Sequence, residues 1–182
     1  MRRILKSAST LVLSLAFVAG AGVHAFAKDF WVLQTSEGKV EIELLPDVAP
    51  NHVKRIKELT KEGFYNGIVF HRVIDGFMAQ GGDPTGTGRG GSKKPDLNAE
   101  FSNIPFDRGI VGAARSQNPD SANSQFFIMF NQGHFLNNQY TVFGRVTEGM
   151  KAVDKLERGL GQGGEVPEER RDQIIKATIV SK

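Results

Sequence analysis

The stretch FHRVIDGFMAQGGD, from Phe70 to Asp83, places one arginine between apolar residues and follows it with a tight turn. Apolar runs over 68–74 and 77–81 predict two strands joined by the turn at Asp75-Gly76. Arg72 lies in the first of these strands. Because a guanidinium keeps its proton in proteins, Arg72 is a fixed cationic donor and neither an acid nor a base. Such a donor beside apolar side chains suits a reaction that needs hydrogen bonding and exclusion of water without a covalent intermediate.

Short strand patterns continue on both sides of this hairpin. They are found at 31–35, 39–44, 109–114, 125–130, 140–146 and 174–180. Alternation within 125–130 puts residues 125, 127 and 129 on one strand face and residues 126, 128 and 130 on the other. The spacing of apolar residues predicts two helices, over 50–63 and 150–156. Many short strands with two helices predict a mainly β domain, either a sandwich or a barrel.

The first 27 residues have the pattern of an export signal. A basic start, an apolar stretch over 11–21 and the run Ala25-Phe26-Ala27 are typical of a secretory signal peptide. We therefore expect a signal peptide over 1–27 and one mature domain over 28–182. The expected destination is the periplasm, with secretion as the alternative. An uncleaved anchor stays open, although the apolar stretch is short for a membrane span.

Removal of that segment changes the charge of the protein. It takes away three basic residues and no acidic ones, so the formal net charge falls from +3 to about zero. The basic composition is therefore no evidence for nucleic-acid binding. The chain has no cysteine, which excludes disulfides and an acylated lipoprotein anchor. The histidines and Asp83 lack the spacing of metal ligands, and we expect no metal and no cofactor.

Three ordered runs, 70–83, SQFFIMF at 124–130 and FLNNQYTVFGRV at 135–146, resemble the cyclophilin family of peptidyl-prolyl cis-trans isomerases. With the signal pattern, the chain resembles the exported bacterial branch of that family. The resemblance implies a closed eight-stranded antiparallel β-barrel capped by two α-helices, with Arg72 as the catalytic residue. It also implies ten substrate-binding positions: Phe77, Met78, Gln80, Ala114, Arg115, Gln125, Phe127, Phe135, Leu136 and Tyr140.

The resemblance divides these positions by role. The walls of the proline pocket would be Phe77, Met78, Phe127 and Leu136. Gln80 would hold the guanidinium of Arg72 and touch the substrate. Ala114 and Arg115 would offer main-chain hydrogen bonds to the peptide, with Gln125 beside them. The implied partners are proline-containing unfolded or flexible polypeptides, and we expect the protein to act as a monomer without membrane attachment after cleavage.

Three positions depart from the most familiar family pattern. Phe135 stands where many members carry tryptophan, Tyr140 where many carry histidine, and Arg115 where many carry asparagine. Because Phe135 lacks the indole N–H that bonds cyclosporin in those members, we expect weak binding of cyclosporin A with isomerase activity retained.

Two functions fit these residues. The first is an isomerase that accelerates rotation about X-Pro bonds during the folding of exported proteins. The second is a chaperone or adaptor module that binds proline-containing segments, with incidental isomerase activity. The same pocket would serve both, so the sequence discriminates weakly between them.

Overall fold

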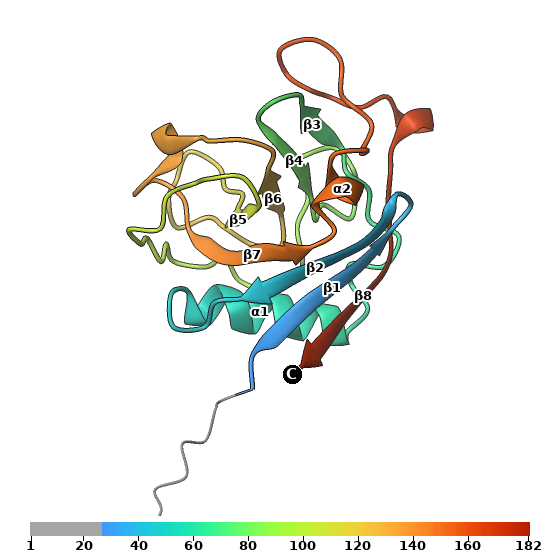
Figure 1. Ribbon diagram of the computed structural model, residues 1–182. Coiled ribbons are helices and arrows are strands. Elements are labelled where there is room, and N and C mark those ends of the chain that lie inside the picture. The colour runs from blue at the N-terminus through green and yellow to red at the C-terminus, as the bar shows by residue number, and fades with distance from the viewer. Residues whose placement is uncertain (1–26) are drawn as a thin grey trace, which may run out of the picture.

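The computed structural model describes residues 27–182, which form one curled, eight-stranded antiparallel sheet with two α-helices (Figure 1). The mainly β prediction is therefore confirmed. The signal peptide that we predict lies, apart from Ala27, outside the described residues. Within 27–182, no helix is long and apolar enough to cross a lipid bilayer.

The strands follow each other around the sheet in the order β3-β4-β6-β5-β7-β2-β1-β8. Their bounds are β1 (Asp29–Thr35), β2 (Gly38–Leu44), β3 (Arg72–Ile74), β4 (Met78–Gly81), β5 (Ile110–Ala113), β6 (Phe126–Met129), β7 (Val142–Glu148) and β8 (Ile174–Ser181). The helices are α1 (Pro50–Lys61) and α2 (Met150–Val153), with 3-10 turns η1 (His134–Leu136) and η2 (Glu168–Arg170).

The sheet is not a closed barrel, and that expectation is wrong. Its edge strands, β3 and β8, are not paired with each other as strands. The chain before β3 meets the chain at the start of β8 through an isolated bridge between Val69 and Gln173. Hydrogen bonds from Phe70 N to Asp172 O (2.9 Å) and from Ile174 N to Ile68 O (2.8 Å) flank this bridge. Because β3 is only three residues long, the two edges touch locally without continuing the ladder.

Helix α1 forms because apolar side chains recur on one face after a proline at its start. Val53, Ile56 and Leu59 on that face are buried, and Figure 1 shows the helix running along one side of the sheet. The second helix is shorter than the 150–156 that apolar spacing predicts, because only residues 150–153 are helical. Leu156 is nevertheless buried in the interior.

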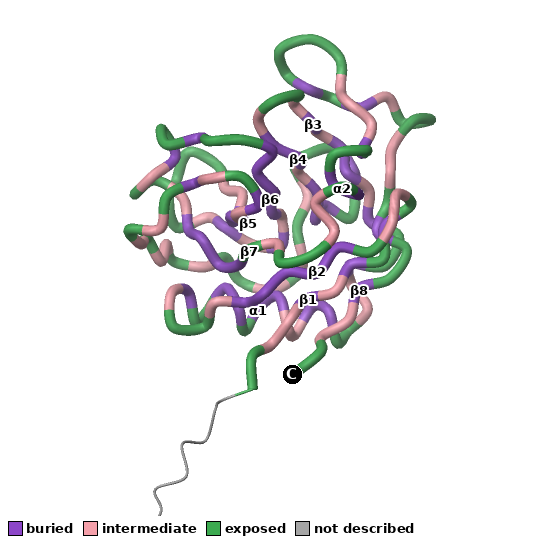
Figure 2. Tube along the Cα trace, in the orientation of Figure 1, coloured by how far each residue is buried: buried purple, intermediate pink, exposed green. Residues whose placement is uncertain are grey.

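Buried apolar side chains form two separate clusters. The larger, which we call the main core, includes Trp31, with the rings of Tyr65 and Phe126 packed edge-on at 4.9 and 4.8 Å between centroids. The smaller, which we call the groove cluster, consists of Met78, Phe106, Phe127, Met129, Leu136 and Val142. Strand β6 separates them, and Figure 2 shows this strand buried along its length.

The alternation predicted for this strand is confirmed. Residues 126, 128 and 130 belong to the main core, whereas residues 127 and 129 belong to the groove cluster. A single strand therefore supplies one face to the interior and the other to a second apolar surface, where the candidate site lies.

Candidate active site

Strand register places three of the predicted residues in one row across the sheet. Arg72 of β3 is opposite Gln80 of β4, and Gln80 is opposite Phe127 of β6. The turn at 75–76 joins the first two strands, and Gly76 there has a φ of +67°, a conformation that favours glycine. The hairpin thus brings a cation and an amide together, and the pairing of β4 with β6 places an aromatic ring beside them.

Two neutral acceptors hold the guanidinium of Arg72. Its Nη1 donates to Oε1 of Gln80 at 3.1 Å, and its Nε donates to the carbonyl oxygen of Gly163 at 2.9 Å. The side chain is half-buried, and burial lowers the pKa of Arg72 below the ordinary arginine value, yet an arginine stays protonated at neutral pH. Within residues 27–182, Nη2 donates to no acceptor, so the N–H groups of this nitrogen are available to a substrate.

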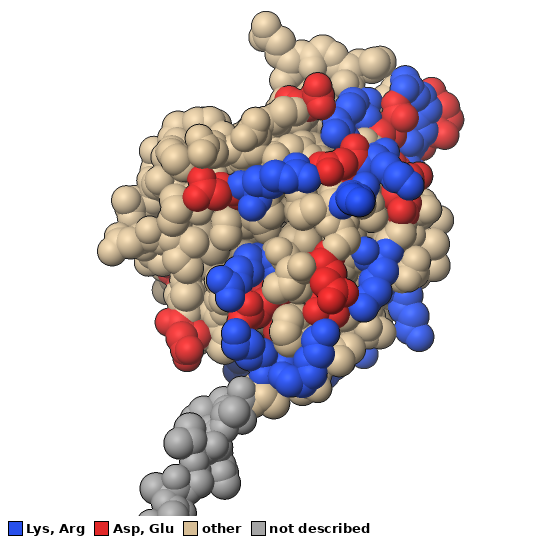
Figure 3. Space-filling view, in the orientation of Figure 1, with Lys and Arg blue, Asp and Glu red and all other residues tan. Residues whose placement is uncertain are grey.

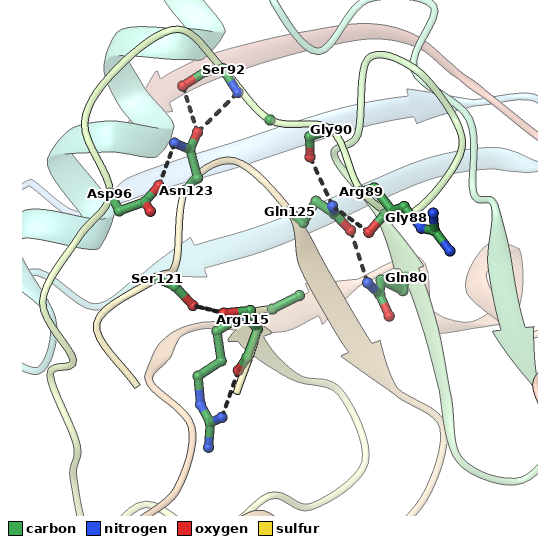
Figure 4. Close-up of a pocket in the computed structure, with 13 residues that line it drawn as sticks. Gln80, Gly88, Arg89, Gly90, Ser92, Asp96, Arg115, Ser121, Asn123 and Gln125 are labelled. Carbon is green, nitrogen blue, oxygen red and sulfur yellow. Dashed lines mark hydrogen bonds between the residues drawn. The ribbon is translucent and has the colours of Figure 1, made fainter. Parts of the chain in front are cut away.

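A chain of side-chain amides fixes the orientation of Gln80. Its Nε2 donates to Oε1 of Gln125 at 2.9 Å, and Nε2 of Gln125 donates to the carbonyl oxygens of Gly88 (3.1 Å) and Gly90 (2.9 Å). Figure 4 shows these bonds in sequence from Gln80 to the glycine-rich loop. Because each amide has a defined donor and acceptor, Gln80 presents its oxygen, rather than its nitrogen, to Arg72.

The glycine-rich loop is itself held by one buried carboxylate. Asp83 accepts hydrogen bonds from the backbone N–H groups of Thr85 (2.8 Å), Gly88 (2.6 Å) and Gly90 (3.1 Å). Burial alone would raise the pKa of Asp83, but these donors lower it below its ordinary value. The loop is therefore a fixed wall for the amide chain.

Apolar side chains line the groove next to this polar row. Met78, Phe127 and Leu136 are buried in the groove cluster, and Phe77 and Tyr140 are packed half-buried against it. The ring of Tyr140 meets that of Phe127 edge-on at 5.8 Å between centroids. These side chains form a hydrocarbon surface directly beside the amide row of β4 and β6.

Glycine is required at one point beneath this surface. A Cβ on Gly112 would lie 2.5 Å from the ring of Phe127 and 2.7 Å from that of Phe106. The two rings stack at 5.6 Å between centroids in the space that the missing side chain leaves. Phe135 is different, since it is 66% exposed and rests on Phe77 at the rim, with 5.4 Å between ring centroids.

Two cavities flank Gln80. The first, of about 520 Å³, lies between the glycine-rich loop and the segment of Ala114 and Arg115 (Figure 4). The second, of about 1120 Å³, includes Arg72 and Gly163 in its lining. The N–H of Ala114 is used by the carbonyl oxygen of Gln125 at 3.0 Å. The N–H of Arg115 has no partner within 27–182 and can donate to a peptide in the first cavity.

The structure brings all eleven predicted site residues to this groove, with Phe135 at its outer rim. Their individual roles stay predictions. Reasoning from the sequence missed Gly163, which lies in the segment 159–166 that runs along β3. That segment is held by hydrogen bonds from Val73 N to Gly164 O (2.7 Å) and from Val166 N to His71 O (3.0 Å). Its richness in glycine was the only available signal.

No three histidine, aspartate or glutamate side chains within 27–182 come together as a metal site. His71 is buried, and neither of its ring nitrogens has a hydrogen-bond partner in this part of the chain. Burial lowers the pKa of His71, so its imidazole is neutral at neutral pH. The chemistry of the groove therefore consists of arginine cations, several amides and an apolar wall.

Comparison with known proteins gives a consistent result. The family model described as "Cyclophilin type peptidyl-prolyl cis-trans isomerase/CLD" matches residues 30–179. A probable peptidyl-prolyl cis-trans isomerase of Brucella suis biovar 1 is 51% identical, over 98% of this chain and 96% of its own length. A peptidyl-prolyl cis-trans isomerase of Acinetobacter baylyi is 41% identical, over 73% of this chain and 74% of its own.

A similar fold is found among solved structures. A Cryptosporidium parvum cyclophilin type peptidyl-prolyl cis-trans isomerase, crystallised in the presence of the dipeptide Ala-Pro, matches with a TM-score of 0.76 and 30% sequence identity. The match covers 84% of this chain and 99% of that chain.

Proposed function

Because the chain belongs to the cyclophilin-type peptidyl-prolyl cis-trans isomerases, we propose that it rotates X-Pro bonds of exported polypeptides by a non-covalent mechanism with Arg72 as donor. Membership of this family identifies the protein as an isomerase. The observation that supports the role of Arg72 is its half-buried guanidinium, fixed by Gln80 and Gly163, while Nη2 has no acceptor within 27–182. The Ala-Pro dipeptide of the Cryptosporidium structure supports a proline-containing substrate.

The chemistry follows from the electronic structure of the amide. The cis and trans forms of an X-Pro bond differ by only about 0.5–1 kcal/mol, but rotation must break resonance and takes tens to hundreds of seconds. In the twisted transition state the prolyl nitrogen is pyramidal and has a lone pair that the planar amide lacks. A donor aimed at that nitrogen binds the transition state more tightly than either ground state, and this difference lowers the barrier.

Magnitudes show that a donor alone is insufficient. A turnover near 10³ s⁻¹ needs an acceleration of roughly 10⁴- to 10⁵-fold, which is about 5–7 kcal/mol. One preorganised donor supplies about 3–4 kcal/mol. The remainder must come from holding the proline against hydrocarbon, because the twisted amide is less polar than the planar one. The groove cluster beside Arg72 offers such a surface through Met78, Phe127 and Leu136.

The test is a proline-limited refolding or peptide assay that compares the mature protein with Arg72→Ala. We expect kcat/KM to fall at least about 10²-fold, as for the loss of one preorganised donor. Unchanged activity would end the proposed role of Arg72.

A second candidate is a module whose function is to bind proline-containing segments. Two cavities on either side of Gln80 give room for more than the proline, which favours an extended peptide. If Arg72→Ala loses isomerisation but still supports the cellular function of the protein, binding is the function that matters. Loss of both would favour catalysis.

Export is the part of the proposal supported by the sequence pattern over 1–27. The mature chain would begin at Lys28 and work on polypeptides in the periplasm, or outside the cell if the protein is secreted. Mass measurement of the protein from separated cell fractions checks both points. A chain that keeps residues 1–27 in the cytoplasmic fraction would contradict export.

Cyclosporin A provides a further check of the groove. Phe135 is largely exposed at the rim and carries no N–H group to bond the drug. We expect weak inhibition with full isomerase activity. Tight inhibition at nanomolar concentrations would contradict this expectation.

A further inference from the structure

The nine arginines within 27–182 fall into three groups by their partners. Five of them contact a carboxylate: Arg108 with Asp154, Arg145 with Glu43, Arg158 with Asp75, Arg170 with Glu157, and Arg171 with Glu168. Arg55 is buried and donates to the carbonyl oxygen of Pro95. Within 27–182, the remaining three arginines have no carboxylate partner, and all three line the groove: Arg72, Arg89 and Arg115.

Arg115 is held rigidly by neutral groups. Its Nη2 and Nε donate to the carbonyl oxygen of Gln139 at 2.8 and 3.1 Å, and Nη1 donates to that of Ser116 at 2.8 Å. The guanidinium also lies 4.3 Å from the ring centroid of Tyr140. None of these contacts neutralises the positive charge, so Arg115 presents a fixed cation at the rim.

Arg89 extends from the glycine-rich loop without a hydrogen bond or ion pair of its guanidinium to any residue within 27–182. Figure 4 shows its side chain pointing away from the bonded amides of Gln80 and Gln125. The backbone that carries it is fixed, because Asp83 binds the N–H groups of Gly88 and Gly90 on either side. A cation without a partner on an ordered loop can therefore contact a ligand in either cavity, because both cavities include Arg89 in their lining.

Basic side chains outnumber acidic ones in the lining of both cavities. In the first cavity Arg89 and Arg115 are accompanied by one acid, Asp96, which accepts from Nδ2 of Asn123 at 2.9 Å. In the second, Glu168 faces Arg171 at 3.9 Å, and Glu165 is the other acid. Since the mature chain has a net charge of about zero, the positive rim is a local feature and not an excess spread over the surface.

We propose that Arg89 and Arg115 make the protein selective for proline segments that carry aspartate or glutamate within two residues of the proline. The inference rests on the proposed function, because it concerns the substrate of the same groove. A carboxylate there would replace the ion-pair partner that both arginines lack. Exposed charge pairs are weak individually, so the two together should raise kcat/KM roughly 3- to 10-fold, and salt should reduce the effect.

The experiment uses peptides that differ only in one charge. Blocked peptides Ac-X-Ala-Pro-Ala-Z-NH₂ carry glutamate, glutamine or lysine at X or at Z, and isomerisation by the mature protein is measured by NMR exchange. We expect the glutamate peptide to exceed its glutamine counterpart at one position or both by roughly 3- to 10-fold at low salt. Lysine should fall below glutamine at that position.

Variants test whether these two side chains carry the preference. The glutamate-to-glutamine ratio should fall at least about twofold in Arg89→Gln and approach one in Arg89→Gln with Arg115→Gln. Lys176→Gln removes the same charge from an exposed residue of β8 outside both cavities, and should leave the ratio unchanged.

A wild-type ratio of one at both positions would overturn the inference, as would a ratio that survives both arginine changes. If no peptide is isomerised, the proposed function fails and the inference falls with it. Isomerisation of the glutamine peptides without a preference for glutamate would reject the inference alone.

Discussion

On the face formed by β1, β2, β7 and β8, basic and acidic side chains lie next to one another, as Figure 3 shows, and several of them form ion pairs. Along the groove, by contrast, Arg72 and Arg115 donate to neutral oxygens, and the guanidinium of Arg89 has no partner within 27–182. On the paired face, Glu43 contacts Lys28 and Arg145, each at 2.7 Å. Glu41 likewise contacts Lys39 at 3.4 Å and Lys182 at 2.8 Å.

The charges of these two regions have different roles. Glu41 and Glu43 are both buried, so their cations offset the cost of taking carboxylates out of water. A carboxylate beside Arg72 would likewise occupy the N–H donors of the guanidinium and neutralise its positive charge. Because Arg72 has amide and carbonyl partners instead, its position is fixed while its charge stays available to the substrate.

Among changes to the partners of Arg72, the largest effect is expected when this arginine is given a carboxylate partner, as the cations of the paired face have. Gln80→Glu would place a carboxylate on Arg72 where an amide oxygen now accepts at 3.1 Å. We expect kcat/KM to fall on the order of tenfold, because the ion pair weakens the donor toward the substrate, and stability to fall by about 1 kcal/mol, because a glutamate cannot donate to Gln125 as Nε2 of Gln80 does. Peptide assays and urea unfolding measure the two effects. Activity equal to wild type would show that the neutrality of the acceptor is irrelevant.

The next effect concerns the carbonyl acceptor of Arg72. Gly164 has a φ of +69°, and a Cβ there would overlap the side chain of Ile74. Gly164→Ala should therefore destabilise the protein by about 1–3 kcal/mol and lower kcat/KM severalfold, as the neighbouring Gly163 carbonyl shifts away from Arg72. Gly163→Ala is the matched control, since a Cβ on Gly163 meets nothing within 4 Å. Equal effects of the two changes would contradict this account of the loop.

The smallest expected effect is that of removing the Glu43 charge on the paired face, and it concerns the pH dependence of stability. Hydrogen bonding to Lys28 lowers the pKa of Glu43 below its ordinary value of 4.5, despite burial. The stability that this ionised carboxylate contributes is present above pH 4.5 and is lost as pH falls through the lower pKa of the folded state. Glu43→Gln should therefore weaken the fall in unfolding free energy as the pH is lowered below 4.5, without altering kcat/KM. An unchanged slope would argue against the pairing.

Local features of this molecule were predictable from its sequence. The turn at 75–76 follows from its aspartate and glycine, and the two faces of β6 follow from strand alternation. Both depend on residues that are neighbours in the chain. The row of Arg72, Gln80 and Phe127 was accessible only through the family resemblance, because β6 is distant from β3 and β4 in sequence.

The errors come from contacts that residue types do not encode. Whether β3 pairs with β8 depends on segments about 100 residues apart, and the short length of β3 leaves the sheet open there. The contact between Arg72 and Gly163 uses a main-chain carbonyl, which every residue possesses. No residue pattern marks such an acceptor, so apart from its richness in glycine the segment 159–166 gave no sign of its place beside Arg72.

We propose that the guanidinium of Arg72, which has no carboxylate partner within 27–182, serves catalysis, whereas that of Arg145, which is paired with Glu43, serves stability. The most direct test measures kcat/KM and the free energy of unfolding for Arg72→Gln and Arg145→Gln together. We predict that Arg72→Gln loses on the order of 10²-fold in kcat/KM with stability within about 0.5 kcal/mol. Arg145→Gln should lose about 1 kcal/mol of stability with kcat/KM within about twofold. Near-normal activity of Arg72→Gln, or equal loss of activity in both variants, would contradict the account.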